Sequence, residues 1–413
     1  MPELLPFRSY YYREGKDENK LNELIAPPYD VISEEEKIEL KKNLNNICHV
    51  ILPESYEAAG LKLEEMINNQ ILITKKDRCL YIYGIDYKRP DTGEKISRYG
   101  FVGLLRLVEI FPSNEGVIPH EMTFRKYTED RLQLIKKTDA NFSPIFTIYN
   151  GMNGTAEKIF EKYIKKKPFL KAKDRDNFTH KVWEVKEEED INKFKEIAQN
   201  HKIIIADGHH RFITCLRHSR HGGCKYIMAL FIDFNDPGLI IYTSHREVHK
   251  FNINSINELK SRLKDNFIIK DIANLEDLQK LMEDNKNKHV FGCYFQDKYL
   301  FLRLKESIRP EDVINGIHSD VWKSLNIPIL HDVLLKDCLD VENDNITFIK
   351  DVIKGIQKVD EGKISALFII NPTTLSEIHA ITRLGEIMPQ KSTYFYPKPL
   401  SGLVIHRHSN YIE

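Results

Sequence analysis

The sharpest change from apolar to polar residues in the chain lies between positions 203 and 211. Three consecutive β-branched residues, Ile203 to Ile205, predict a strand that is buried on both faces. Asp207 and Gly208 follow almost at once, and glycine permits a tight turn with close approach of the backbone to a ligand. The residues from Arg211 to Arg217 then suit a helix. The pattern therefore predicts a strand, a glycine turn and a helix in direct succession.

Similar patterns predict further strands and helices along the chain. Two hairpins are expected, at Cys79–Tyr87 with Arg98–Ile110 and at Tyr226–Phe234 with Leu239–Thr243, and two strands are expected at His289–Phe295 and Tyr299–Leu304, around Gln296 to Lys298. Ile364–Ile370 is a further strand. Helical spacing occurs at Glu129–Lys137, Gly154–Lys167, Glu187–Asn200, Ile256–Asn266, Leu275–Asn285, Pro310–Ser324, His331–Leu339 and Leu375–Met388. Ser33 is expected to cap another helix. We expect an α+β protein.

Length and composition limit the possible classes of protein. A chain of 413 residues with 41% apolar residues suits two or three domains, and we divide it into 1–115, 116–250 and 251–413. Lys+Arg and Asp+Glu both number 61, which argues against a dedicated nucleic-acid or membrane-surface protein. No signal peptide or membrane span is recognisable, so the expected location is the cytoplasm. Six cysteines without a C-x-x-C pair suggest reduced, mostly buried thiols rather than disulfides or a structural zinc site.

The turn after Ile205 is the first candidate for chemistry. A helix that begins after a glycine turn presents backbone N–H groups and the positive end of its dipole to an anion. Arg211 would add a planar charged fork, and His209 and His210 would add donors. This combination predicts a phosphate site at Gly208. An ordinary turn with surface histidines remains the alternative, because no Walker-type or G-x-G-x-x-G motif is present.

Two further stretches carry candidate residues. Pro119 disfavours helix before it, so His120 and Glu121 are expected where a strand ends, and Glu121 could act as a general base or merely cap a helix. Lys391, Ser392 and Thr393 offer one cation and two hydroxyls on a proline-bounded loop, which suits an anionic or zwitterionic ligand or a simple polar turn. His245 and Arg246 end a predicted strand, either near the Asp207 turn or on the surface.

These stretches together resemble a known family. Pro28-Tyr29-Asp30-Val31-Ile32-Ser33, His120-Glu121 with Thr123, Asp130-Arg131, Asn141 to Phe146, Asp207 to Arg211, His245-Arg246 and Met388 to Phe395 occur in this order in a long-uncharacterised bacterial and archaeal family. Its Asp-Gly-His-His-Arg segment resembles the phosphate-binding box of the ParB/sulfiredoxin superfamily, and the family is similar to the free L-serine kinases of that superfamily. The resemblance implies a ParB/sulfiredoxin-like nucleotide-binding core with additional mixed α/β domains.

The resemblance also implies an activity and roles for residues. The reaction would transfer a phosphoryl group from ATP, or ADP, with Mg²⁺ to the hydroxyl of free L-serine, giving O-phospho-L-serine. Nucleotide and L-serine would be the partners. The implied catalytic residues are Glu121 as base, Asp207 as magnesium or water-positioning group, and His209. The implied phosphate and nucleotide residues are Gly208, His209, His210, Arg211, Thr123 and Arg131, and the implied substrate residues are His120, Ser143, His245, Arg246, Lys391, Ser392 and Thr393.

Three other functions remain open from the sequence. A ParB-like nucleotide hydrolase or switch would use the same cradle without an amino-acid pocket. A non-enzymatic module would bind nucleotide only for regulation. A metal hydrolase would need ligands beyond the adjacent His209 and His210, and no third ligand has motif spacing. Incubation with nucleotides and a panel of amino acids distinguishes these functions.

Overall fold

The computed structural model describes residues 1–90, 92–110, 116–121, 125–151, 154–250, 252–389 and 391–410. The chain divides into two compact units. Unit 1 comprises Met1–Pro119, Thr123–Ile240 and Phe395–Glu413, and unit 2 comprises His120–Met122 and Ile241–Tyr394. Each unit thus combines segments that are far apart in the sequence. The division at residues 115 and 250 stays a prediction.

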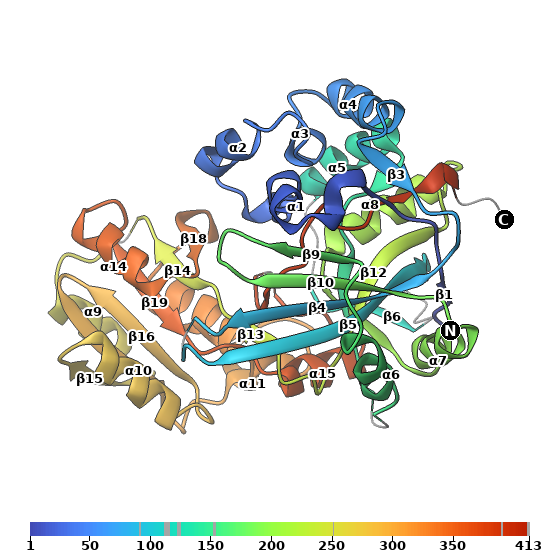
Figure 1. Ribbon diagram of the computed structural model, residues 1–413. Helices are drawn as coiled ribbons and strands as arrows, with labels where there is room; N and C mark the ends of the chain where they lie inside the picture. The colour runs from blue at the N-terminus through green and yellow to red at the C-terminus, as the bar shows by residue number, and fades with distance from the viewer. Residues whose placement is uncertain are drawn as a thin grey trace. The chain divides into compact units, whose positions relative to one another are not determined.

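Unit 1 is built on a nine-stranded mixed sheet (Figure 1). Its strand order is β6 (Val117–Pro119), β11 (Ile203–Asp207), β8 (Ile145–Tyr149), β12 (Tyr226–Asp233), β5 (Lys95–Arg106), β4 (Leu80–Lys88), β10 (Thr179–Val185) and β9 (Leu170–Lys173), with β1 (Leu4–Leu5) beside β5. The predicted hairpin of residues 79–110 is confirmed by the antiparallel pairing of β4 with β5. The isoleucine strand is also confirmed: β11 runs parallel to β6 and antiparallel to β8.

The hairpin predicted for residues 226–243 is wrong. Every residue of β12 is buried, and the strand pairs antiparallel with β5 and parallel with β8. Both edges of β12 are therefore occupied by strands from earlier in the chain. The next strand, β13 (Ile240–Tyr242), has no edge of β12 on which to pair. An apolar run signals a strand, but it does not signal the partner of that strand.

Helices lie on both sides of the unit 1 sheet (Figure 1). They are α1 (Glu18–Leu24), α2 (Glu34–Leu40), α3 (Cys48–Ile51), α4 (Tyr56–Asn68), α5 (Arg125–Thr138), α6 (Thr155–Ile164), α7 (Glu188–Asn200) and α8 (His209–Ser219). Two short strand pairs add to them, β2 (Tyr10–Tyr12) with β3 (Leu72–Thr74) and β7 (Ala140–Asn141) with β21 (His406–Arg407). Ser33 caps α2 as predicted, in a capping box with Glu36. In the core, Phe101 of β5 stacks on Phe194 of α7, with the ring centroids 4.4 Å apart.

Unit 2 contains a six-stranded antiparallel sheet. Its order is β15 (Phe267–Ile272), β17 (Lys298–Leu304), β16 (Val290–Phe295), β19 (Ala366–Ile370), β14 (His245–Val248) and β18 (Ile346–Ile349). The two strands predicted within residues 289–304 are confirmed as β16 and β17, which pair antiparallel. The helices are α9 (Ile256–Leu263), α10 (Leu275–Asp284), α11 (Pro310–Val313), α12 (Asp320–Lys323), α13 (Asn326–Pro328), a π-helix at Ile329–Cys338, α14 (Val352–Asp360) and α15 (Leu375–Arg383). The strand β20 (Tyr394–Tyr396) spans the boundary between the two units along the chain.

Two predicted helices of unit 2 are shorter than expected. The helix predicted at 310–324 is two separate turns, α11 and α12, and Gly316 between them has a φ of 113°. The helix predicted at 375–388 ends at Arg383, where Gly385 takes a φ of 74°. A glycine in the left-handed region just past the last turn is a common helix stop. In both places a glycine with positive φ lies within three residues of the end of a helix, where the predicted helix is interrupted.

The described chain is a mixed α/β protein, as predicted. A ParB/sulfiredoxin-like core stays a prediction. Of the six cysteines, Cys48, Cys79, Cys215 and Cys293 are buried, as expected for mostly buried thiols. Among the described helices, none combines the length and the apolar character required to cross a bilayer.

Candidate functional site

The glycine turn after β11 is formed as the sequence predicts. Ile203, Ile204 and Ile205 are buried, and α8 begins at His209 directly after Gly208. Gly208 has a φ of 93°, in the left-handed region that other residues rarely adopt. A Cβ atom at this position would lie 2.8 Å from a side-chain carbon of Ile145 and 2.8 Å from Nη2 of Arg211. Both backbone conformation and space therefore require glycine at the start of α8.

Replacing Gly208 by Ala is expected to lower the free energy of unfolding by about 1–3 kcal/mol, because the new Cβ adds strain and a close contact. Gly222→Ala is the matched control, since Gly222 has a φ of 89° but open space around it. Urea titrations of both variants separate the two causes. Equal losses would show that the close approach of Ile145 and Arg211 contributes nothing.

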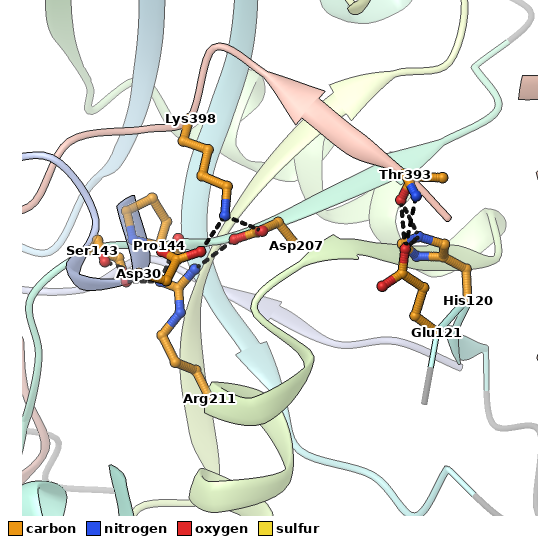
Figure 2. A network of polar contacts seen from close by, with 9 residues as sticks. All are labelled: Asp30, His120, Glu121, Ser143, Pro144, Asp207, Arg211, Thr393 and Lys398. Atoms are coloured by element: carbon orange, nitrogen blue, oxygen red, sulfur yellow. Dashed lines mark hydrogen bonds and ion pairs between the residues drawn. The ribbon is translucent and has the colours of Figure 1, made fainter. Parts of the chain in front are cut away.

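Four charged side chains gather at this turn (Figure 2). Nζ of Lys398 lies 2.5 Å from a carboxylate oxygen of Asp30 and 2.6 Å from one of Asp207. Nη2 of Arg211 donates to the other oxygen of Asp207 at 3.2 Å. The Lys398 side chain is only 6% exposed. Two cations and two carboxylates thus form one compact network in unit 1, which we call the Lys398 cluster.

The Lys398 cluster keeps Asp30 ionised. Burial raises the pKa of this carboxyl, but the charge and hydrogen bond of Lys398, with the charge of Arg211, lower it more, to about 2. Burial and the neighbouring Asp30 charge raise the pKa of the adjacent Tyr29, so its hydroxyl stays protonated at neutral pH. Asp30 is positioned by the short 3₁₀ turn Tyr29–Val31, which follows two prolines.

Arg211 also ties α8 to the loop before β8. Its Nη1 donates to the hydroxyl of Ser143 at 2.9 Å, to the carbonyl of Ser143 at 3.2 Å and to the carbonyl of Pro144 at 2.9 Å. The guanidinium is therefore held in place by neutral acceptors on one side and by Asp207 on the other. Ser143 and Arg211, which the sequence singled out separately, are direct partners.

A pocket of about 550 Å³, counted with its open mouth, adjoins this network in unit 1. The guanidinium of Arg131 lies over the ring of Tyr29, with its central carbon 4.3 Å from the ring centroid. Both residues line the pocket. Its apolar lining includes Ile51, Leu134, Ile135, Ile145 and Ile227, and its polar lining includes Asn141, Ser143 and Arg211. Mostly apolar walls with a few polar groups are typical of small-molecule sites.

His120 and Glu121 lie in unit 2, where they contact the loop before β20 (Figure 2). Oε1 of Glu121 accepts hydrogen bonds from the backbone N–H of Thr393 at 3.0 Å and from its hydroxyl at 2.9 Å. Nε2 of His120 lies 2.7 Å from the same hydroxyl. The backbone of Glu121 forms a parallel bridge with Met388. Glu121 and Thr393 are thus joined although 272 positions separate them in the sequence.

Arg246 lies in the same unit and is fully buried. Its Nε donates to Nε2 of His331 at 2.9 Å, and its Nη1 donates to the carbonyl of Ser244. Burial lowers the pKa of Arg246 to about 10, and the charge of Glu121 opposes this shift. Ser392 is buried and donates to the carbonyl of Pro389. Arg246 is therefore positively charged at neutral pH and interacts electrostatically with Glu121.

Acid is expected to destabilise unit 2 through two histidines beside Arg246. Burial, and then the charge of Arg246, lowers the pKa of His245 and of His331 to about 4. The unfolded chain binds these protons near pH 6.5, so stability is intact above that pH and falls as the pH drops toward 4. We expect a loss of about 2 kcal/mol per histidine between pH 7 and pH 5.

Urea titrations of the wild type and of His331→Gln at both pH values test this expectation. The variant should lose less stability than the wild type on acidification, because one of the two protonation sites is gone. An identical loss in both proteins would contradict it.

The predicted site residues fall into two groups. Gly208, His209, His210, Arg211, Asp207, Arg131 and Ser143 lie in unit 1, and His120, Glu121, His245, Arg246, Lys391, Ser392 and Thr393 lie in unit 2. Thr123 lies outside the described residues. The sequence interpretation did not assign Asp30 or Lys398 to the site. The rigid proline loop before Tyr29 did draw attention to Tyr29 and Asp30, and Lys398 lies in the proline-rich stretch that ends at Pro399, but neither Asp30 nor Lys398 was given a role.

Comparison with known proteins places the chain in a family. A family model described as "Protein of unknown function (DUF1015)" matches residues 4–327. The chain belongs to this family. Among curated proteins, this DUF1015 protein is 22% identical over 194 residues to an ATP-dependent L-serine kinase of Staphylothermus marinus. The match covers 46% of this chain and 66% of the kinase, which is just under two thirds of the length of that relative.

The similarity of this chain to solved structures is low. A conserved hypothetical protein from Pyrococcus furiosus has a TM-score of 0.34 and 15% identity, over 69% of this chain and 90% of the other. A variant of a free serine kinase in complex with ADP has a TM-score of 0.36 and 14% identity, over 70% and 89% of the two chains. A C-terminally truncated SbnI from Staphylococcus aureus has a TM-score of 0.35 and 12% identity, over 73% and 85%.

Proposed function

We propose that this DUF1015 protein is a small-molecule kinase that transfers a phosphoryl group from ATP, or ADP, to the hydroxyl of free L-serine. The observation that carries the proposal is the Lys398 cluster at the glycine turn that begins α8. A helix N-terminus with two adjacent cations suits the phosphates of a nucleotide. The distant curated relative, an ATP-dependent L-serine kinase, supports the same reaction.

The donor nucleotide would bind in unit 1. Its phosphates would contact Lys398 and the first turn of α8, where a phosphate oxygen competes with the carboxylates for the ammonium group. The base would occupy the pocket beside Tyr29 and Arg131, whose apolar walls suit a flat heterocycle. Arg211 would keep Ser143 and α8 in register, because its backbone lies in α8 and its guanidinium donates to Ser143 and Pro144.

The acidic residues of the Lys398 cluster fit a magnesium ion. Oxygens of Asp30 and Asp207 contact the same Nζ atom at 2.5 and 2.6 Å, so they lie no more than about 5 Å apart. Mg²⁺ prefers oxygen ligands and is usually held by one or two carboxylates together with substrate phosphates. Asp30 and Asp207 would hold the ion, which would neutralise charge on the phosphates.

Glu121 is the proposed base. Its carboxylate would take the proton from the serine hydroxyl as the serine oxygen bonds to the transferred phosphorus. The bond between that phosphorus and the bridging oxygen of the nucleotide breaks, and the shortened nucleotide leaves with the electron pair. Asp30 suits this role less well, because a carboxylate with a pKa of about 2 is a weak proton acceptor at neutral pH. Arg246 would attract the carboxylate of serine through its positive charge.

The full chain, incubated with Mg²⁺, ATP or ADP, and each of a panel of amino acids, tests the proposal. We expect O-phospho-L-serine by mass spectrometry, and strongly reduced product with Arg211→Ala. Nucleotide hydrolysis without a phosphorylated amino acid would instead favour a ParB-like hydrolase. Nucleotide binding without turnover would favour a regulatory module.

A further inference from the structure

Three potential metal ligands meet in unit 1, away from the Lys398 cluster. Asp139, His218 and His408 each offer one ligand atom, and these atoms lie within 4.8 Å of one another. Asp139 directly follows α5, His218 lies in the last turn of α8, and His408 directly follows β21. We call this group the Asp139 triad. Its members come from three segments that are far apart in the sequence.

The backbone fixes two members of the triad side by side. β7 and β21 pair antiparallel, with Arg407 opposite Ala140. The pairing continues beyond the strands, since the N–H of His408 donates to the carbonyl of Asp139 at 2.8 Å. The N–H of Ser409 donates to Oδ2 of Asp139 at 3.0 Å, which leaves Oδ1 facing His408. The carboxylate is therefore oriented by its own turn.

The third member is also held by its surroundings. Gly223 packs against the ring of His218, and a Cβ atom at Gly223 would lie 2.3 Å from Cδ2 of that ring. The rings of His218 and His408 have centroids 6.3 Å apart. The loop after α8 thus packs closely against the ring of His218.

The buried ring nitrogens of the triad lack hydrogen bonds. His408 is 5% exposed, and neither of its ring nitrogens has the geometry of a hydrogen bond among the described residues, although Nδ1 lies within ion-pair distance of Asp139. Nδ1 of His218 is also buried and also forms no hydrogen bond among the described residues. A buried polar atom without a partner costs free energy, so native structures rarely keep one without a reason. An electron-pair acceptor bound by these nitrogens, such as a metal ion, would remove this free-energy cost.

We propose that the Asp139 triad binds a divalent transition-metal ion of the zinc class. Two imidazole nitrogens and one carboxylate oxygen form a ligand set that suits Zn²⁺, Co²⁺ or Ni²⁺ and does not suit the oxygen-binding ions Ca²⁺ and Mg²⁺. Oδ1 of Asp139 lies 3.4 Å from Nδ1 of His408. This separation matches the edge of a tetrahedron with metal–ligand bonds of about 2.0–2.1 Å.

The metal would join three segments of unit 1. α5 and α8 pack against each other, and the triad links the ends of both helices to the strand near residue 408. α8 carries the glycine turn at its other end. A metal at the triad therefore stabilises the helix on which the proposed nucleotide site is built, without contacting the nucleotide. Sequence motifs could not reveal the site, because its ligands are separated by 79 and 190 positions.

Metal titration of the full chain tests the proposal. Protein freed of metal with a chelator is titrated with Zn²⁺ against a chromophoric competitor, and with Co²⁺ for the visible absorption of tetrahedral coordination. We expect one ion per chain, and affinity reduced at least about 100-fold in His218→Ala and in Asp139→Asn. The ion should also raise the temperature of thermal unfolding of the wild type.

His221→Ala is the matched control, because His221 is exposed and lies only three residues beyond His218. It should bind the ion as the wild type does and show the same thermal shift. Circular dichroism verifies that each variant is folded, and Asp139→Asn preserves the size of the side chain if His218→Ala does not fold. Absence of binding, or equal affinity in the wild type and in both triad variants, would overturn the proposal.

Discussion

Glu121→Gln is expected to lower kcat for serine phosphorylation by about 10²–10⁴-fold, the usual contribution of a positioned general base. The substitution keeps an oxygen that can accept the two hydrogen bonds from Thr393. It removes the ability to take a proton. The nucleotide Kd should stay within about twofold, because the substitution preserves the size of the side chain and Glu121 is proposed to act on the serine hydroxyl, not to hold the nucleotide.

Steady-state kinetics and nucleotide titrations on the same samples measure both quantities. Glu306→Gln serves as control, since Glu306 forms an exposed ion pair with Lys288 elsewhere in unit 2. Thr393→Val removes one hydrogen bond from Glu121 but keeps its carboxylate, so this variant should retain more activity than Glu121→Gln. Near wild-type turnover of Glu121→Gln would remove Glu121 as the base.

Lys398→Met is expected to lower the free energy of unfolding by about 3 kcal/mol, because it leaves two carboxylates without their shared cation. The loss lies at the lower end of the range for a broken buried pair. The Asp30 side chain is 40% exposed, so water screens part of its charge. Lys20→Met, which removes an exposed ion pair with Glu14, should change stability far less, because water screens the pair.

The difference in the free energy of unfolding between the wild type and Lys398→Met should become smaller as the pH falls. Lys398 lowers the pKa of Asp30 to about 2, below the value of about 3.9 for an unfolded aspartate. The stability from this pair is therefore fully present above about pH 5 and is lost as the pH falls through 3.9 toward 2. Urea titrations at pH 7 and pH 3 measure the change. A difference that is constant between the two pH values would contradict the role of Asp30.

Local signals in the sequence determined much of the secondary structure and part of the candidate site. The isoleucine triplet, Gly208 and the residues after it gave β11, the left-handed turn and α8, because burial, backbone freedom and helix spacing act within a few residues. The cap at Ser33 and the hairpin of β4 and β5 followed for the same reason. His120 and Glu121 were correctly expected at a strand end.

The partners of these elements were decided only by the tertiary structure. Lys398 meets Asp30 across 368 positions, and the Asp139 triad collects ligands from three distant segments. β12 pairs with β5 and β8, although the next apolar run is nearer in sequence. Charge pairing and strand pairing depend on which segments the core brings together. Hydrophobic periodicity records that a segment is buried, but it does not record which segment buries it.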